Sequence, residues 1–180
     1  MNMINTLALV VLSSLALSFS HSAVVVEYEI GGKGPAGGIV FYVTEDRSHG
    51  LEAAPVVLGS APWGCSESSI VGGTHTSLGS GKLNTQLIVN QCGEGTAAAL
   101  ANNYAGGGYI DWYLPSKGEL SLMYKNLAEL GAGNYAGGNY WSSSEYEFGN
   151  SYAWVNDFGV ILQIEDVKSE EVGVRAVRAF

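Results

Sequence analysis

Three β-rich runs open the chain beyond residue 22, and turn-forming residues separate them. The runs are AVVVEYEI (23–30), GIVFYVT (38–44) and LEAAPVV (51–57). Branched and aromatic residues favour strands, whereas the glycines and charged residues of the intervening GGKGPAG and EDRSHG favour turns. We therefore predict three N-terminal strands.

Two short helices are predicted next, after a long loop. The stretch from Leu58 to Gly81 is rich in Gly and Ser, and a loop of this length indicates either a function or dependence on a disulfide. LNTQLIVNQ (83–91) and TAAALANNYA (96–105) then have the composition of short helices. Thr96 is the expected cap of the second helix.

A third helix is predicted by a capping box in LPSKGELSLMYKNLAEL. The Ser116 side chain can accept a hydrogen bond from the backbone N–H of Glu119, while the Glu119 carboxylate accepts one from the N–H of Ser116. Such a cap stabilises a helix by about 1 kcal/mol. Apolar residues then recur at steps of three and four, which predicts one buried face: Leu120, Met123, Tyr124, Leu127 and Leu130.

Strands return in YWSSSEY (140–146), where three serines follow a tryptophan. The alternation of a strand sorts these residues onto two faces: Tyr140, Ser142, Ser144 and Tyr146 on one, and Trp141, Ser143 and Glu145 on the other. A nucleophilic serine needs a base, usually His, and often a strained turn such as G-x-S-x-G. These serines do not stand in that context, so we do not expect serine catalysis, although His49 and His75 could fold nearby.

Composition and charge narrow the possible functions. The chain of 180 residues fits one domain with a single core, and its 25 glycines indicate frequent turns. The formal net charge is −9. Because an acidic surface repels phosphate backbones, nucleic acid is not an expected partner.

The first residues have the pattern of a targeting signal. An apolar run extends from Leu7 to Leu17, and the small residues Ser20 and Ser22 follow at the spacing of a cleavage site. We predict a signal peptide over 1–22 and a single mature domain over 23–180, in a secreted, periplasmic or cell-surface location. The run is shorter than the roughly 20 residues that span a bilayer, so no membrane-spanning helix is expected. A retained N-terminal helix is the alternative, because no Lys or Arg precedes the run.

Two cysteines are present, Cys65 and Cys92. An exported chain meets an oxidising compartment, so we predict a disulfide between them. Closing this loop would stabilise the fold by about 3.5 kcal/mol on the chain-entropy model. Redox and zinc roles are less favoured, because the pair lacks C-x-x-C spacing and neither His49 nor His75 stands at zinc-ligand spacing.

Seven motifs carry a family resemblance from about Gly34 to Phe180: GPAGGIVFYV, HGLEAAP, WGC, GTAAALANNY, GYIDWYLPSKGELSLMY, YWSSSEY and VRAVRAF. In this order they resemble the bacterial Lcl C-terminal-type domain, a family of exported domains. The resemblance implies an α+β, C-type-lectin-like fold. Such a fold has a twisted, mostly antiparallel sheet, two or three flanking helices, neighbouring chain ends and a long loop-rich region that displays the ligand surface. It also implies adhesion through a surface glycan or protein ligand.

The resemblance also implies where a ligand would bind. Relatives with this fold include the variable proteins of diversity-generating retroelements, whose ligand-binding residues cluster just before the final strand. Carried over to this chain, the set is Tyr146, Phe148, Asn150, Tyr152, Trp154, Asn156, Asp157 and Gln163. Its chemistry fits independently, because Tyr and Trp give stiff contact area while Asn supplies adaptable hydrogen bonds, as in antibody loops.

A packing role is the alternative for part of this set. Tyr152, Trp154 and Phe158 alternate along the chain and would form the inward face of a strand. We expect Trp154 to belong to the core, and Tyr146 and Phe148, together with Asn150, to be the contacts.

Calcium is a second alternative at the same segment. WVND is similar to the W-N-D element with which many C-type lectins hold the ion, and Asn156 and Asp157 are oxygen ligands of the right kind. The inserted Val155 changes the face of each ligand, and the companion E-P-N motif is absent. We therefore expect no cofactor. From Glu145 to Glu171, seven carboxylates face one lysine, a local balance of −6 that would attract a cation or a basic partner.

Enzymatic activity is the competing class. YLPSKGEL and VRAVRAF are also similar to formylglycine-generating-enzyme-like domains, which share the expected fold. Those enzymes bind copper through cysteines late in the domain, and none follows Cys92 here. We therefore expect a module without catalysis, and a passive envelope component remains a third possibility.

The last strand carries two arginines. Arg175 and Arg178 fall on opposite faces of GVRAVRAF. We expect at least one of them to pair with a buried carboxylate such as Glu119 or Asp111.

Overall fold

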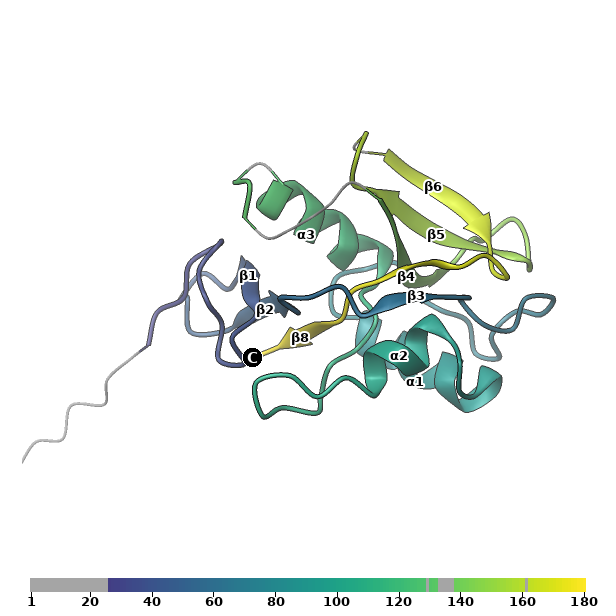
Figure 1. The fold of residues 1–180 in the computed structure, drawn as a ribbon, viewed down its shortest axis with the longest axis horizontal. Coiled ribbons are helices and arrows are strands. Elements are labelled where there is room, and N and C mark those ends of the chain that lie inside the picture. The colour runs from purple at the N-terminus through teal and green to yellow at the C-terminus, as the bar shows by residue number, and fades with distance from the viewer. Residues whose placement is uncertain (1–25, 129, 133–137, 161) are drawn as a thin grey trace, which may run out of the picture.

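Five strands form the larger of two sheets. The computed structural model of the chain describes residues 26–128, 130–132, 138–160 and 162–180. The strand order is β3-β7-β4-β5-β6, and the strands are β3 (Gly59–Ala61), β7 (Val172–Val174), β4 (Asn139–Glu145), β5 (Tyr152–Asp157) and β6 (Leu162–Val167). Figure 1 shows β5 and β6 side by side in this sheet. The described pairs are antiparallel except β4 with β7. An α+β architecture with a mostly antiparallel sheet was predicted and is confirmed.

The smaller sheet joins the two ends of the described chain. It contains β1 (Ile39–Val43), β2 (Gly50–Ala53) and β8 (Val177–Ala179), with β2 in the middle and both pairs antiparallel. The rings of Tyr28 and Phe180 meet edge to face, with their centroids 4.6 Å apart. The N-terminal segment and the last residue therefore lie side by side.

Helices cover both faces of the central strand β4. Trp141 is buried in a cluster that includes side chains of α1 (Gly81–Cys92) and α2 (Ala97–Asn102). Its neighbour Tyr140 is buried in a second cluster with side chains of α3 (Lys117–Ala128). Because neighbouring residues of a strand point to opposite faces, β4 lies between two helical layers (Figure 1).

The local capping signals are confirmed. The Ser116 N–H donates to a Glu119 carboxylate oxygen at 2.8 Å, and the Glu119 N–H donates to Ser116 Oγ at 3.2 Å. Thr96 Oγ1 accepts the N–H of Ala99 at 3.1 Å and so caps α2. Within α3, the apolar stripe is buried as expected at three positions: Leu120, Met123 and Leu127.

Four expectations about element boundaries were wrong. The predicted strand over 51–57 corresponds to β2 and ends at Ala53. Residues 26–30, the described part of the first predicted strand, form no strand. The predicted 58–81 loop begins with β3, because Gly59–Ala61 pairs with β7, a partner more than 100 positions away that local sequence cannot reveal. Leu130 is 59% exposed, because α3 ends at Ala128 and the chain turns there.

The N-terminal prediction lies outside the described residues. The proposed signal peptide, 1–22, falls in the part of the chain whose placement the structure does not describe. Among the residues that are described, no helix is long and apolar enough to cross a membrane.

Candidate ligand-binding surface

The connection between β4 and β5 is a closed turn that projects aromatic side chains. The N–H of Tyr146 donates to the carbonyl of Tyr152 at 3.0 Å, and the N–H of Tyr152 donates to the carbonyl of Gly149 at 3.1 Å. Glu145 and Ala153 pair directly below it in the ladder. One of these hydrogen bonds joins the two ends of the turn and the other lies within it. The backbone that carries the side chains of the turn is therefore fixed.

Four rings of this region contact one another, and we call them the aromatic cluster: Tyr146, Phe148, Tyr152 and Trp154. Tyr146 lies at its centre, with ring centroids 5.5 Å from Phe148, 6.5 Å from Tyr152 and 5.1 Å from Trp154, all edge to face. Phe148 is 81% exposed and Tyr152 is 40% exposed. Such contacts orient aromatic rings, so the cluster offers a preformed apolar surface.

Trp154 is a half-buried member of the cluster and not a core residue. The side chains of β5 that enter the core are Ala153 and Val155, so the inward face has the opposite parity to the one considered from sequence. The alternative in which Tyr152 and Trp154 pack inward is therefore wrong for this strand. Phe158, beyond the end of β5, is buried against α3.

A lysine that the sequence did not single out lies on Trp154. Lys117 Nζ stands 3.0 Å from the centroid of the Trp154 ring, a cation–π arrangement, while Trp154 Nε1 donates to Glu147 at 3.1 Å. Partial burial lowers the pKa of Lys117, and the nearby Glu147 carboxylate opposes that shift. Backbone and Trp154 hydrogen bonds lower the pKa of Glu147. A positive and a negative group therefore flank one ring at the border of the cluster.

The last three residues of the predicted ligand-binding set, Asn156, Asp157 and Gln163, have structural partners. Asn156 is only 4% exposed, and its side-chain oxygen accepts a hydrogen bond from Gln163 at 3.1 Å. Gln163 also donates to the carbonyl of Lys117 at 3.3 Å. Asp157 Oδ1 accepts the N–H of Gly159 at 2.6 Å in the turn that follows β5. Asn156 is thus buried on the face of β5 opposite Ala153 and Val155, and Asp157 holds a turn.

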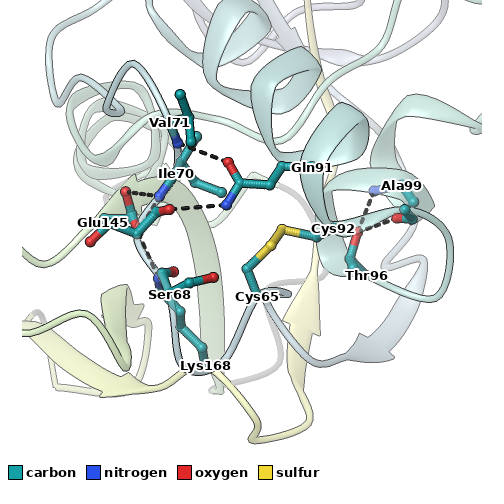
Figure 2. The surroundings of a disulfide bond; sticks show 12 residues. Cys65, Ser68, Ile70, Val71, Gln91, Cys92, Thr96, Ala99, Glu145 and Lys168 are labelled. Atoms are coloured by element: carbon teal, nitrogen blue, oxygen red, sulfur yellow. Dashed lines mark hydrogen bonds and ion pairs between the residues drawn. A yellow bond between two sulfur atoms is a disulfide. The ribbon is translucent and has the colours of Figure 1, made fainter.

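The long loop that carries Cys65 is fastened to helix α1 (Figure 2). The predicted disulfide between Cys65 and Cys92 is present, with a Cα–Cα distance of 5.2 Å. Gln91 of α1 accepts the N–H of Val71 and donates to the carbonyl of Ser69. Ser69 Oγ in turn donates to the side-chain oxygen of Asn150 at 2.9 Å. The loop therefore supports the turn that bears Asn150.

A buried ion pair fastens the same loop from below (Figure 2). Lys168 is fully buried, and its Nζ lies 2.6 Å from a Glu145 carboxylate oxygen and 3.0 Å from the carbonyl of Ser68. The Glu145 carboxylate also accepts the N–H of Ile70. The one lysine of the acidic C-terminal segment is therefore part of the scaffold.

The three serines of β4 are buried and hydrogen-bonded. Ser143 Oγ accepts a bond from the side chain of Asn84 at 3.2 Å, and Ser142 Oγ accepts the N–H of Ser144 at 3.2 Å. Ser144 Oγ accepts the N–H of Lys117 at 3.0 Å and donates to the carbonyl of His75 at 2.8 Å. His75 thus approaches Ser144 through its backbone. These hydroxyls join the loop, α1 and α3 to the central strand.

The expected arginine–carboxylate pair is confirmed, with a further partner. Arg178 Nε bonds Asp111, and its Nη1 lies 3.0 Å from Glu52, which is fully buried. Glu119 instead accepts bonds from Ser116, Gly79 and Tyr113, and burial raises the pKa of its carboxyl. Glu52 was not singled out from sequence, because it stands in an ordinary strand pattern.

Metal ligands do not converge within the described part of the chain. No group of three or more His, Cys, Asp or Glu side chains there is arranged to hold a metal ion. The side chains of Asn156 and Asp157, which the similarity to W-N-D suggested as calcium ligands, accept hydrogen bonds from Gln163 and Gly159.

Comparison with known proteins adds no assignment. Neither a scan against protein-family models nor a search of the curated proteins gave a match. The resemblance to the Lcl C-terminal-type domain stays a prediction from the motifs.

Proposed function

We propose that this chain is an exported, non-catalytic ligand-binding module that recognises a surface glycan or protein through the aromatic cluster and Asn150. The observation that carries the proposal is the exposure of Phe148, 81%, within a set of four contacting rings on a hydrogen-bonded turn. An exposed apolar cluster of this kind marks an interaction site on a soluble domain.

The scaffold behind the cluster supports this proposal. The α+β arrangement, the neighbouring ends of the described part of the chain and the long loop held by the disulfide agree with what a C-type-lectin-like fold of the Lcl C-terminal type implies. The disulfide agrees with an oxidising, extracytoplasmic location. Tyr and Trp side chains lose little entropy on binding, so a fixed aromatic surface binds without reorganisation.

The structural role of the serines separates this proposal from an enzymatic one. Ser142, Ser143 and Ser144 are fully buried and hydrogen-bonded within the scaffold. Both cysteines are in the disulfide, and copper-dependent chemistry of the formylglycine-generating type needs free thiols. A genetically diversified receptor is a variant of the same proposal. A near-identical repeat and a reverse transcriptase gene beside the coding DNA would identify it.

Arrays of glycans and of cell-surface proteins test the proposal. The wild type should bind a subset of either array, and a Tyr146→Ala, Phe148→Ala, Asn150→Ala triple variant should lose that binding without losing its fold. Ile110→Ala is the matched control, because Ile110 is 82% exposed and lies outside the cluster. Repeating the arrays with a chelator tests calcium. Equal binding by the triple variant would refute the proposal, and a passive envelope component would bind neither array.

A further inference from the structure

A second surface of the molecule contains two adjoining hollows, beside strand β3 and helix α2. One, of about 310 Å³, is lined by Ser60 and Ala61 of β3, by Leu100 of α2 and by the carboxylates of Glu94 and Glu171. The other, of about 290 Å³, is lined by Leu58, Tyr104 and Ala105 and shares Leu100 with the first. Figure 1 shows β3 and α2 side by side at this place. The hollows therefore form one groove with an apolar floor.

Charge in the groove is of one sign. Glu94 and Glu171 line the first hollow, and neither hollow has a lysine or arginine in its lining. Each carboxylate accepts a hydrogen bond from a neighbouring side chain: Asn103 donates to Glu94 at 3.0 Å, and Ser60 donates to Glu171 at 3.2 Å. These bonds fix the carboxylates without neutralising them. On a chain of net charge −9, a cationic group is the complementary occupant.

Strand β3 lies at the edge of the five-stranded sheet. Its described partner is β7 on one side, and Gly59 and Ser60 are exposed. An edge strand presents backbone N–H and C=O groups that a further extended chain can pair with. An extended segment of a partner protein is therefore favoured over a compact cation.

The spacing of the hollows follows the strand. Leu58 borders one hollow and Ser60 the other, two positions apart along the chain, with Gly59 at a positive φ between them. Alternate side chains of an extended, paired segment are about 6.8 Å apart, so one such segment can present a side chain to each hollow. One apolar side chain and one basic side chain, separated by one residue, thus match the two hollows in turn.

We propose that this groove docks an extended, basic segment of a partner protein, paired with β3, with an apolar side chain against Leu58, Leu100 and Tyr104 and a lysine or arginine between Glu94 and Glu171. This surface is separate from the aromatic cluster, and the proposal does not depend on the function assigned to that cluster.

Selection from a library of short randomised peptides tests the proposal with the full mature protein. The enriched peptides should carry Lys or Arg two positions from an aliphatic or aromatic residue. A synthetic peptide from that set should bind the Glu94→Gln, Glu171→Gln double variant at least about tenfold more weakly, because charge complementarity is lost. The control is Glu45→Gln, Glu67→Gln, which removes two exposed carboxylates elsewhere and should leave the dissociation constant unchanged.

Two further measurements distinguish strand pairing in this groove from binding elsewhere on the molecule. Methylation of alternate peptide amides should weaken binding in one register only, as strand pairing requires. Phe148→Ala should leave peptide binding unchanged, so failure of the aromatic-surface proposal is distinguishable from failure here. Enrichment without Lys or Arg, equal affinity for the double variant, or no peptide binding at all would overturn the docking proposal.

Discussion

The serines of β4 and the rings that follow them occupy opposite environments, although they are neighbours in one hairpin. Ser142, Ser143 and Ser144 are fully buried, whereas Phe148 is 81% exposed. The hydroxyls are buried because each has a hydrogen-bond partner, which removes the cost of leaving water. The rings remain outside because Ala153 and Val155 fill the core side of β5. Polarity alone therefore does not place a side chain; the partners available at that position do.

The same contrast extends to charge. Glu52 and Lys168 are fully buried and paired, while Glu94 and Glu171 in the groove beside β3 are exposed. The buried groups connect segments far apart in sequence, and the exposed ones face solvent. Breaking buried pairs should therefore damage the fold, and changing exposed groups should change binding.

Removing the buried carboxylate of Glu52 should have the largest effect on stability. Glu52 accepts the N–H groups of Ala36 and Gly38 and pairs with Arg178. We expect Glu52→Ala to lower the free energy of unfolding by about 3–5 kcal/mol, because it leaves buried donors and an arginine without that partner. Urea unfolding measures this, with the exposed Glu45→Ala as control. A loss equal to that of the control would contradict the scaffold role.

Opening the disulfide should have the next largest effect. The Cys65→Ala, Cys92→Ala double variant should lose about 3.5 kcal/mol of unfolding free energy on the chain-entropy model. It should also weaken ligand binding at Asn150, because the same loop carries Ser69. Unfolding with and without reductant provides the comparison for the wild type. An unchanged transition midpoint in reductant would show that the other loop contacts suffice.

Removing one buried hydroxyl should have a smaller effect. Ser144→Ala leaves the Lys117 N–H at the start of α3 without its acceptor, at a cost of about 1–3 kcal/mol. Ser66→Ala, at an exposed position of the loop, is the control. Equal stability of the two variants would mean that the buried serine is not a structural partner.

Replacing Asp46, in an exposed turn, should have the smallest effect on stability. The direction of the pH dependence tests whether the pKa of Asp46 is lowered in the folded protein. Hydrogen bonds from Thr44 and Ser48 lower the pKa of Asp46 to about 2 from 3.8. Because the folded pKa is below the ordinary one, the stabilisation is present above pH 3.8 and is lost as the pH falls toward 2. Asp46→Asn should flatten the dependence of melting temperature on pH in this window. A steeper dependence of melting temperature on pH in the variant would contradict a lowered pKa of Asp46.

Local features of this fold were predictable from sequence, and long-range ones were not. The Ser116–Glu119 box and the Thr96 cap involve residues three positions apart, so their chemistry is visible in the sequence. At least one of the two C-terminal arginines was expected to pair with a carboxylate such as Glu119 or Asp111. Arg178 pairs with Asp111, but its other partner, Glu52, which is 126 positions away, was missed. Strand β3 was missed for the same reason, since only its pairing with β7 makes Gly59–Ala61 a strand.

The candidate site shows the same division. The aromatic residues were singled out by composition and resemblance, and the structure brings Tyr146, Phe148, Tyr152 and Trp154 into contact. Lys117 was missed, because its place over Trp154 depends on the packing of α3 against β5.

The most direct measurement compares two phenylalanines that differ in burial. Phe148 is 81% exposed, whereas Phe158 is 7% exposed and packs between Tyr124 and Tyr140. Ligand affinity and melting temperature are measured for Phe148→Ala and Phe158→Ala, with a ligand taken from the arrays. We predict that Phe148→Ala loses affinity at an unchanged melting temperature, while Phe158→Ala lowers the melting temperature and keeps affinity where it is folded. Unchanged affinity in Phe148→Ala, or a fall in its melting temperature as large as that of Phe158→Ala, would contradict the account.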